Sequence, residues 1–134
     1  MSTPKIINEK KKLLQLAPVA KVKLKHHVFV CCGKSCTKVG AGDVIAEFAN
    51  ELEAREMRWG KVSKGRNPKG EIMLTECGSV GFCSVGTAVL VYPEGIWYAQ
   101  VRGEDVKEII ERHLIKGEVV ERLVLKTFEQ EQMN

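Results

Sequence analysis

The sequence contains no apolar run near the roughly 20 residues needed to span a bilayer. It shows no apolar segment of a secretory signal, and its Lys-rich start has no Arg and little Ser, unlike a transit peptide. Aromatic residues are scarce, at 6%, and no nucleic-acid-binding motif is recognisable. These absences predict a cytoplasmic protein with neither a membrane nor a nucleic acid as partner.

The 134 residues suit one domain with a modest core, and the 44% hydrophobic content is ordinary for a globular protein. The net charge of +4 is unevenly spread, because lysines dominate the start and glutamates the end. We expect a basic extension at 1–25, a folded domain at 26–125 and an acidic tail at 126–134. Such an extension either steers the protein to an acidic partner or is a solvated, frayed segment.

Residue patterns predict the order of the elements. β-Branched and apolar runs predict strands at 26–31, 58–62, 71–77, 87–92 and 96–101, with an extended segment at 119–125. Apolar periodicity predicts helices at 6–16, 43–56 and 104–115. Asp43 is expected to be an N-cap, Gly117 a C-cap, and Pro93-Glu94-Gly95 a hairpin turn. The order predicts an α/β fold with a central mixed β-sheet flanked by helices.

Five cysteines are an odd number, which a pure disulfide framework accommodates badly. Cys31 and Cys36 lie where one predicted strand opens into the glycine-rich loop 32–42, and Cys77 and Cys83 where another opens into loop 78–86. If those strands are neighbours, four thiolates meet at one end of the sheet. Each iron of a [2Fe–2S] cluster takes two protein thiolates, so this set suits such a cluster.

Other sites fit the sequence less well. Structural zinc sites usually have more closely spaced cysteines, and a thioredoxin-type dithiol requires a C-x-x-C motif, which is absent. Simple buried or disulfide-paired cysteines remain an alternative. His26 and His27 lie too early on their strand to replace thiolates, and His113 falls on an apolar helix face, where a structural role is expected.

Three segments carry a family resemblance: 26–40 (HHVFVCCGKSCTKVG), 75–98 (TECGSVGFCSVGTAVLVYPEGIWY) and 101–125 (VRGEDVKEIIERHLIKGEVVERLVL). They resemble the thioredoxin-like [2Fe–2S] ferredoxins, a family similar to the cluster domain of the small peripheral subunit of NADH dehydrogenases. The resemblance implies a thioredoxin-like fold with the cluster loops at one end of the sheet. It also implies a homodimer with one [2Fe–2S] cluster per chain.

The resemblance also implies the ligands. Cys31, Cys36 and Cys83 match the family's first, second and fourth ligands. The family usually separates its last two ligands by three residues, which would place the third at Ser79. We favour Cys77, because serine is a rare iron ligand and Cys77 closes its strand. Cys32 is then a small buried thiol or, alternatively, a swap ligand.

We therefore predict a non-enzymatic one-electron carrier between redox partners. Lys34 and Lys38 near the cluster favour a redox protein that is acidic at its docking face. The alternatives are an iron–sulfur redox sensor, a cluster-transfer or assembly protein, and a zinc-stabilised interaction domain. Of the hairpin residues Trp97 and Tyr98, one should face the core and the other could anchor a dimer interface.

Overall fold

A five-stranded mixed sheet forms the centre of the molecule. The computed structural model describes residues 5–128, without the side chain of Cys83. The strands are β1 (His26–Cys31), β2 (Ile72–Cys77), β3 (Val89–Tyr92), β4 (Ile96–Tyr98) and β5 (Val124–Thr127). Their spatial order is β2-β1-β3-β4-β5, with β1 and β2 parallel and the other pairs antiparallel. This confirms the predicted α/β class and its mixed sheet.

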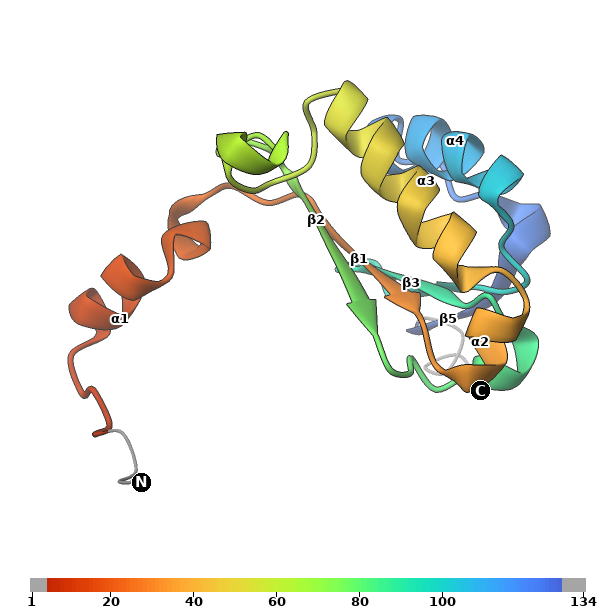
Figure 1. The fold of residues 1–134 in the computed structure, drawn as a ribbon, viewed down its shortest axis with the longest axis horizontal. Coiled ribbons are helices and arrows are strands. Elements are labelled where there is room, and N and C mark those ends of the chain that lie inside the picture. The colour runs from red at the N-terminus through yellow and green to blue at the C-terminus, as the bar shows by residue number, and fades with distance from the viewer. Residues whose placement is uncertain (1–4, 129–134) are drawn as a thin grey trace.

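Helix α3 (Ala41–Ala54) covers one face of the sheet through a single apolar stripe (Figure 1). Val44, Phe48 and Leu52 recur at four-residue steps, which places them on one side of the helix. All three are fully buried against the sheet. The apolar periodicity that predicts a helix at 43–56 thus corresponds to the buried side of α3.

A second helical segment covers the same face of the sheet (Figure 1). It runs through a 3-10 turn, η4 (Gly103–Asp105), then α4 (Val106–Glu108), and then a π-type turn, η5 (Ile109–Ile115). Gly117 follows in the left-handed conformation, with φ of 76°, and its amide bonds to the His113 carbonyl. The predicted helix and its C-terminal glycine are confirmed, although the last turns are not regular α-helix.

The two faces of the sheet differ in composition and exposure. Alternation along β3 directs Val89 and Val91 into the core and leaves Leu90 half-buried on the opposite face. On β4, Tyr98 faces the core and Trp97 the opposite side. Cross-strand register then aligns Phe29, Leu90 and Trp97 in one apolar row. We call this row the open face, because no helix of the described chain covers it (Figure 1).

A buried polar group ties the hairpin to the last helix. The Tyr98 hydroxyl lies 2.7 Å from Nδ1 of His113 and accepts the amide of Val120 at 3.1 Å. Burial raises the pKa of Tyr98 to about 12, so this hydroxyl stays protonated near neutral pH. Burial also lowers the pKa of His113, although the neighbouring Glu94 carboxylate opposes that shift.

Several predicted boundaries were wrong. No strand forms at 58–62, where only isolated bridges join Arg58 to Ile72 and Trp59 to Asn67. The predicted loop 32–42 contains the short helix α2 (Lys34–Lys38), and α3 begins at Ala41. Gly40 precedes α3 with φ of 99°, so Asp43 is inside the first turn and not an N-cap.

Other boundaries shifted more gently. The loop 78–86 ends in the 3-10 turn η3 (Cys83–Val85). At the C-terminal end, 3-10 turn η6 (Glu121–Leu123) precedes β5, which runs to Thr127, two residues beyond the predicted extended segment 119–125. The predicted hairpin is present between β3 and β4, with Gly95 in the left-handed conformation.

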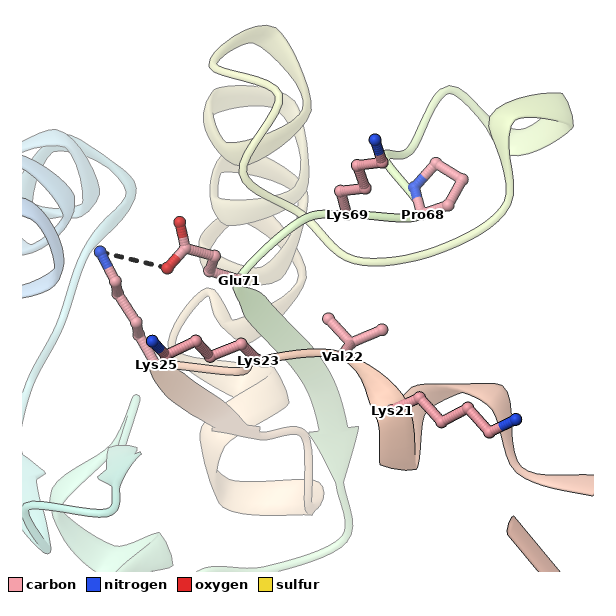
Figure 2. A pocket seen from close by; sticks show the side chains of 7 residues that line it. All are labelled: Lys21, Val22, Lys23, Lys25, Pro68, Lys69 and Glu71. Carbon is pink, nitrogen blue, oxygen red and sulfur yellow. Dashed lines mark ion pairs between the residues drawn. The ribbon is translucent and has the colours of Figure 1, made fainter. Parts of the chain in front are cut away.

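The N-terminal arm extends away from the sheet (Figure 1). It carries α1 (Lys10–Leu16) and the 3-10 turn η1 (Pro18–Lys21), and none of its described residues is buried. A surface hollow lies where the arm meets the loop before β2, lined by Lys21, Val22, Lys23, Lys25, Pro68, Lys69 and Glu71 (Figure 2). Within residues 5–128, no helix is long and apolar enough to cross a membrane.

Candidate metal centre

Two predicted ligands lie side by side at the end of the parallel strand pair. The register of β1 and β2 pairs Cys31 directly with Cys77. The amide of Cys32 donates a hydrogen bond of 2.7 Å to the Cys77 carbonyl, which continues the pairing by one residue. Parallel strands end at the same edge of a sheet, so the two loops that follow begin together. The predicted convergence of these loops is confirmed.

Helix α2 brings Cys36 to the same edge. Cys31, Cys36, Ala41 and Ala88 form a small buried cluster separate from the main core. All four are fully buried, and two of them are the small residues Ala41 and Ala88. The structure thus brings together three of the four predicted ligands: Cys31, Cys36 and Cys77.

The fourth predicted ligand, Cys83, lies on η3, which packs against α2. Its backbone is therefore at the same edge of the sheet, whereas its side chain lies outside the described part of the structure. Ser79, the alternative third ligand, is exposed in the preceding loop, and its hydroxyl accepts the amide of Gly81 at 3.0 Å. Cys77, in contrast, is half-buried at the end of its strand, with Sγ 3.5 Å from the Val30 carbonyl oxygen.

A close approach of main chain to Cys36 completes this edge. A Cβ added at Gly86 would lie 2.5 Å from Sγ of Cys36 and 3.1 Å from its Cα. Real Cβ atoms essentially never show a contact as short as 2.5 Å, so a larger residue at position 86 would require Cys36 or the loop to move. The sequence already suggests that glycines of the loop 78–86 let main chain approach the sulfurs, and the structure identifies Cys36 as the residue that Gly86 meets.

Two apolar residues of the loop after β2 cover the cysteine cluster. Val80 and Phe82 are partly buried against it. The indole Nε1 of Trp97 donates a hydrogen bond of 3.0 Å to the Val80 carbonyl, and the Phe82 ring meets the Trp97 ring edge-on at 5.4 Å. The long loop is thereby fixed to the open face of the sheet, and its apolar side chains restrict access of water to the sulfurs.

Three cationic side chains lie near this edge of the molecule. Lys34 and Lys38 are exposed on α2. The Arg102 guanidinium bonds to the carbonyl oxygens of Gly86, at 3.3 Å, and Val101, at 3.1 Å. Arg102 was not among the predicted site residues; it reaches the site through the loop after β4. These cations favour an anionic group bound between the thiolates.

The fifth cysteine, Cys32, has a different environment from the predicted ligands. It is half-buried and packs against both the main core and the cysteine cluster. Burial, followed by the negative charge of Glu76, raises the pKa of the Cys32 thiol. Its packing between the main core and the cysteine cluster supports the expectation of a small buried thiol.

The donor set narrows the chemistry of the site. Thiolates are soft ligands that select zinc, copper(I) or iron–sulfur clusters over magnesium or calcium. Hydrophobic cover, close main chain and nearby cations are the features that stabilise an anionic iron–sulfur cluster and set its potential. The residues present therefore fit such a cluster.

Comparison with known proteins decides the family. No protein-family model matches the chain. A 2Fe-2S ferredoxin of Clostridium pasteurianum is 38% identical over 107 residues, which cover 74% of this chain and 94% of that protein. A second 2Fe-2S ferredoxin, from Aquifex aeolicus, is 36% identical over 107 residues, or 74% of this chain and 87% of that one. The chain belongs to the [2Fe–2S] ferredoxin family.

Solved structures agree with this membership. The thioredoxin-like [2Fe–2S] ferredoxin from Aquifex aeolicus superimposes with a TM-score of 0.64 at 33% identity, covering 78% of this chain and 94% of that structure. The fold is therefore thioredoxin-like, as the resemblance implied. The cysteines lie at the edge of the sheet where β1 and β2 end. The basic N-terminal arm lies at the far end of the molecule (Figure 1).

Proposed function

We propose that this chain is a [2Fe–2S] ferredoxin that carries one electron at a time between redox partners. The observation that carries the proposal is the register of Cys31 with Cys77 at the ends of two parallel strands, with Cys36 in the same buried cluster. In a member of the ferredoxin family, this arrangement supports a cluster site and not an accidental gathering of thiols. The chain would be a carrier and not an enzyme.

Cys31, Cys36, Cys77 and Cys83 would hold one [2Fe–2S] cluster per chain, which supplies reversible one-electron exchange when bound. The choice of Cys77 over Ser79 is supported by the position of Cys77 at the strand end and by the exposure of Ser79. Gly86 leaves room beside Cys36, and Val80 and Phe82 shield the sulfurs from water.

The partner would dock at the exposed side of α2. Lys34 and Lys38 there would attract a redox protein with an acidic docking face, and the contact should weaken with salt. We also propose that the protein works in the reducing cytosol, where clustered thiols more often bind metal than form disulfides.

The open face would form a homodimer interface. Phe29, Leu90 and Trp97 are apolar, half-buried in the single chain and aligned across three strands. A contiguous apolar row of this kind marks an interaction surface. Leu90 is at its centre, and Trp97 beside it is held in place by ring contacts with Phe82 and Phe128. The second copy of the same chain is the proposed occupant.

The test of the proposed function is anaerobic purification followed by analysis of iron, inorganic sulfide and zinc. We expect iron and sulfide in equal amounts and a paramagnetic signal after one-electron reduction. Zinc without sulfide would instead support the zinc-stabilised interaction domain. Repeated reduction and oxidation then separates a carrier, which keeps its cluster, from a sensor or assembly protein, which loses or transfers it.

A further inference from the structure

Two histidines and a glutamate converge at the end of the sheet opposite the cysteines. The Glu94 carboxylate lies 3.1 Å from Nδ1 of His26 and 2.5 Å from Nε2 of His113. One ligand atom from each of the three side chains lies within 4.8 Å of the other two. His26 begins β1 and Cys31 ends it, which separates the two sites by about 16 Å of extended strand.

Each of the three residues comes from a different element. His26 is the first residue of β1, Glu94 sits in the β3–β4 turn and His113 lies on η5. The His113 side chain is 1% exposed, that of His26 14% and that of Glu94 33%. The group therefore has a buried floor and an open side toward solvent.

The buried imidazole is held from behind. Nδ1 of His113 faces the Tyr98 hydroxyl at 2.7 Å, and that hydroxyl accepts the amide of Val120. A tyrosine hydroxyl can donate or accept, so it can hold His113 in the tautomer that leaves Nε2 free for a metal ion. Metal-bound histidines usually have such a partner on the second nitrogen, which fixes the ring.

We propose that His26, Glu94 and His113 bind a divalent transition-metal ion, for which Zn²⁺ is the probe. Two imidazoles and one carboxylate form a donor set that Zn²⁺ accepts, with water completing the fourth position. Bonds of about 2.0–2.1 Å in tetrahedral geometry place ligand atoms roughly 3.3 Å apart. The His26–Glu94 contact of 3.1 Å is near that value, and a bound ion would lengthen the 2.5 Å contact between Glu94 and His113. Calcium and magnesium prefer sets made of oxygen alone.

The surrounding charges permit this assignment. The ion adds two positive charges beside one carboxylate, so a free cation close by would oppose it. The nearest lysine along the chain, Lys25, is ion-paired with Glu71 at 3.1 Å (Figure 2). A bound ion would join β1, the hairpin turn and the last helix, and would stabilise the fold by binding only the folded chain.

The three side chains are also held together by hydrogen bonds, with no metal required. A matched pair of histidine variants distinguishes a metal site from a group that is only hydrogen-bonded. His26→Gln removes a proposed ligand. His27→Gln removes the adjacent histidine, which bonds to Thr75 on β2 and is not one of the three proposed ligands. Glu94→Gln, in the exposed turn, is a second ligand variant should His26→Gln perturb folding.

The measurement is zinc titration of the cluster-loaded protein by calorimetry, with bound zinc counted after gel filtration. We expect one zinc per chain beyond any held by the cysteines. His26→Gln and Glu94→Gln should weaken it at least about 100-fold, because loss of even an outer-shell partner costs about 10- to 100-fold. His27→Gln should stay within about twofold of the parent.

Equal zinc binding by His26→Gln and the parent chain would overturn the proposal, as would the absence of zinc from the parent. Any zinc on the cysteines is common to every variant, so the difference between His26→Gln and His27→Gln isolates the histidine group. The result therefore stands whether or not the proposed electron-carrier function is correct, because cluster content is measured separately as sulfide.

Discussion

Single side chains decide whether the cysteine edge can hold a cluster. Alanine offers no ligand atom, whereas serine still offers an oxygen, so Cys→Ala is the cleaner substitution. We expect Cys31→Ala, Cys36→Ala, Cys77→Ala and Cys83→Ala to lose most of their inorganic sulfide. Cys32→Ala is the control and should retain its sulfide, because Cys32 packs as a small thiol between the main core and the buried group of Cys31 and Cys36. Sulfide assays on protein purified without oxygen check this.

The identity of the third ligand, Cys77 or Ser79, is the assignment that these variants test most directly. If Cys77→Ala kept its sulfide while Ser79→Ala lost it, the third ligand would be Ser79 and our assignment would be wrong.

Glycine at position 86 is a second requirement at the residue scale. Gly86→Ala places a methyl group 2.5 Å from Sγ of Cys36, so the loop or α2 must move. Overpacking of this kind costs about 1–3 kcal/mol in the free energy of unfolding. We expect a lower thermal midpoint and a reduced sulfide content.

Gly78→Ala is the matched control for that change. It lies in the same loop, but an added Cβ there meets nothing within 4 Å. A Gly86→Ala protein that matched Gly78→Ala in stability and sulfide would show that the close approach to Cys36 has no role.

At the scale of elements, residue patterns predicted the parts whose signal is local. Valines along β1 and β3, the stripe on α3 and the Pro93–Gly95 turn each leave a short periodic or turn signature, and all of them form as expected. The segment 58–62 (RWGKV), predicted as a strand, has only Trp59 and Val62 as apolar residues and makes only bridges. Tertiary pairing, which the local pattern does not encode, decides such cases.

Contacts between distant segments had no such signature. Helix α2 is a single, mostly polar turn that packs on η3. Its sequence has no apolar periodicity of its own, so the segment was predicted to be a loop. The approach of Gly86 to Cys36 and the meeting of His26, Glu94 and His113 likewise depend on the completed sheet. The positions of the cysteines at strand ends and the glycine-rich loops beside them could be predicted; the particular contacts, such as that of Gly86 with Cys36, could not.

Strand β1 also carries a pH-dependent element. Burial lowers the pKa of His27 from 6.5, while its ring stacks on Phe29 and bonds to Thr75. Well above pH 6.5 the residue is neutral in both the folded and unfolded states. As the pH falls, the unfolded chain takes up the proton first, so stability decreases down to the lower pKa of the folded state.

We therefore expect the thermal midpoint to fall between about pH 7.5 and about pH 5.5, measured with a metal chelator present. His27→Gln should flatten this dependence in part. The pKa of His113 is lowered in the same direction, so some slope should remain. Identical pH profiles for His27→Gln and the parent chain would contradict the assignment to His27.

For the whole molecule, the open face predicts self-association. Leu90→Lys places a charge in the middle of the apolar row and should convert the proposed dimer to monomer in sedimentation velocity. Ile115→Lys is the control, because Ile115 is exposed on the helical side, at 54%, and should leave the dimer intact. Both variants should keep their sulfide. A Leu90→Lys protein that sediments like the parent would exclude this interface.

The uneven charge of the molecule predicts how it exchanges electrons. Reoxidation of the reduced protein by anionic hexacyanoferrate(III) should slow severalfold in Lys34→Gln/Lys38→Gln at low ionic strength, because two cations are lost beside the cysteine edge. The difference should shrink as salt screens the charges.

Lys11→Gln/Lys12→Gln removes the same charge from α1, at the far end of the molecule (Figure 1), and should react like the parent. Equal slowing in both double variants would mean that net charge, and not the charge around α2, controls the rate.

The most direct test of the central claim is the ratio of iron, inorganic sulfide and zinc in the anaerobically purified chain. The proposal of a cluster on Cys31, Cys36, Cys77 and Cys83 predicts two irons and two sulfides per chain. Stoichiometric zinc at the cysteines with no sulfide would contradict it.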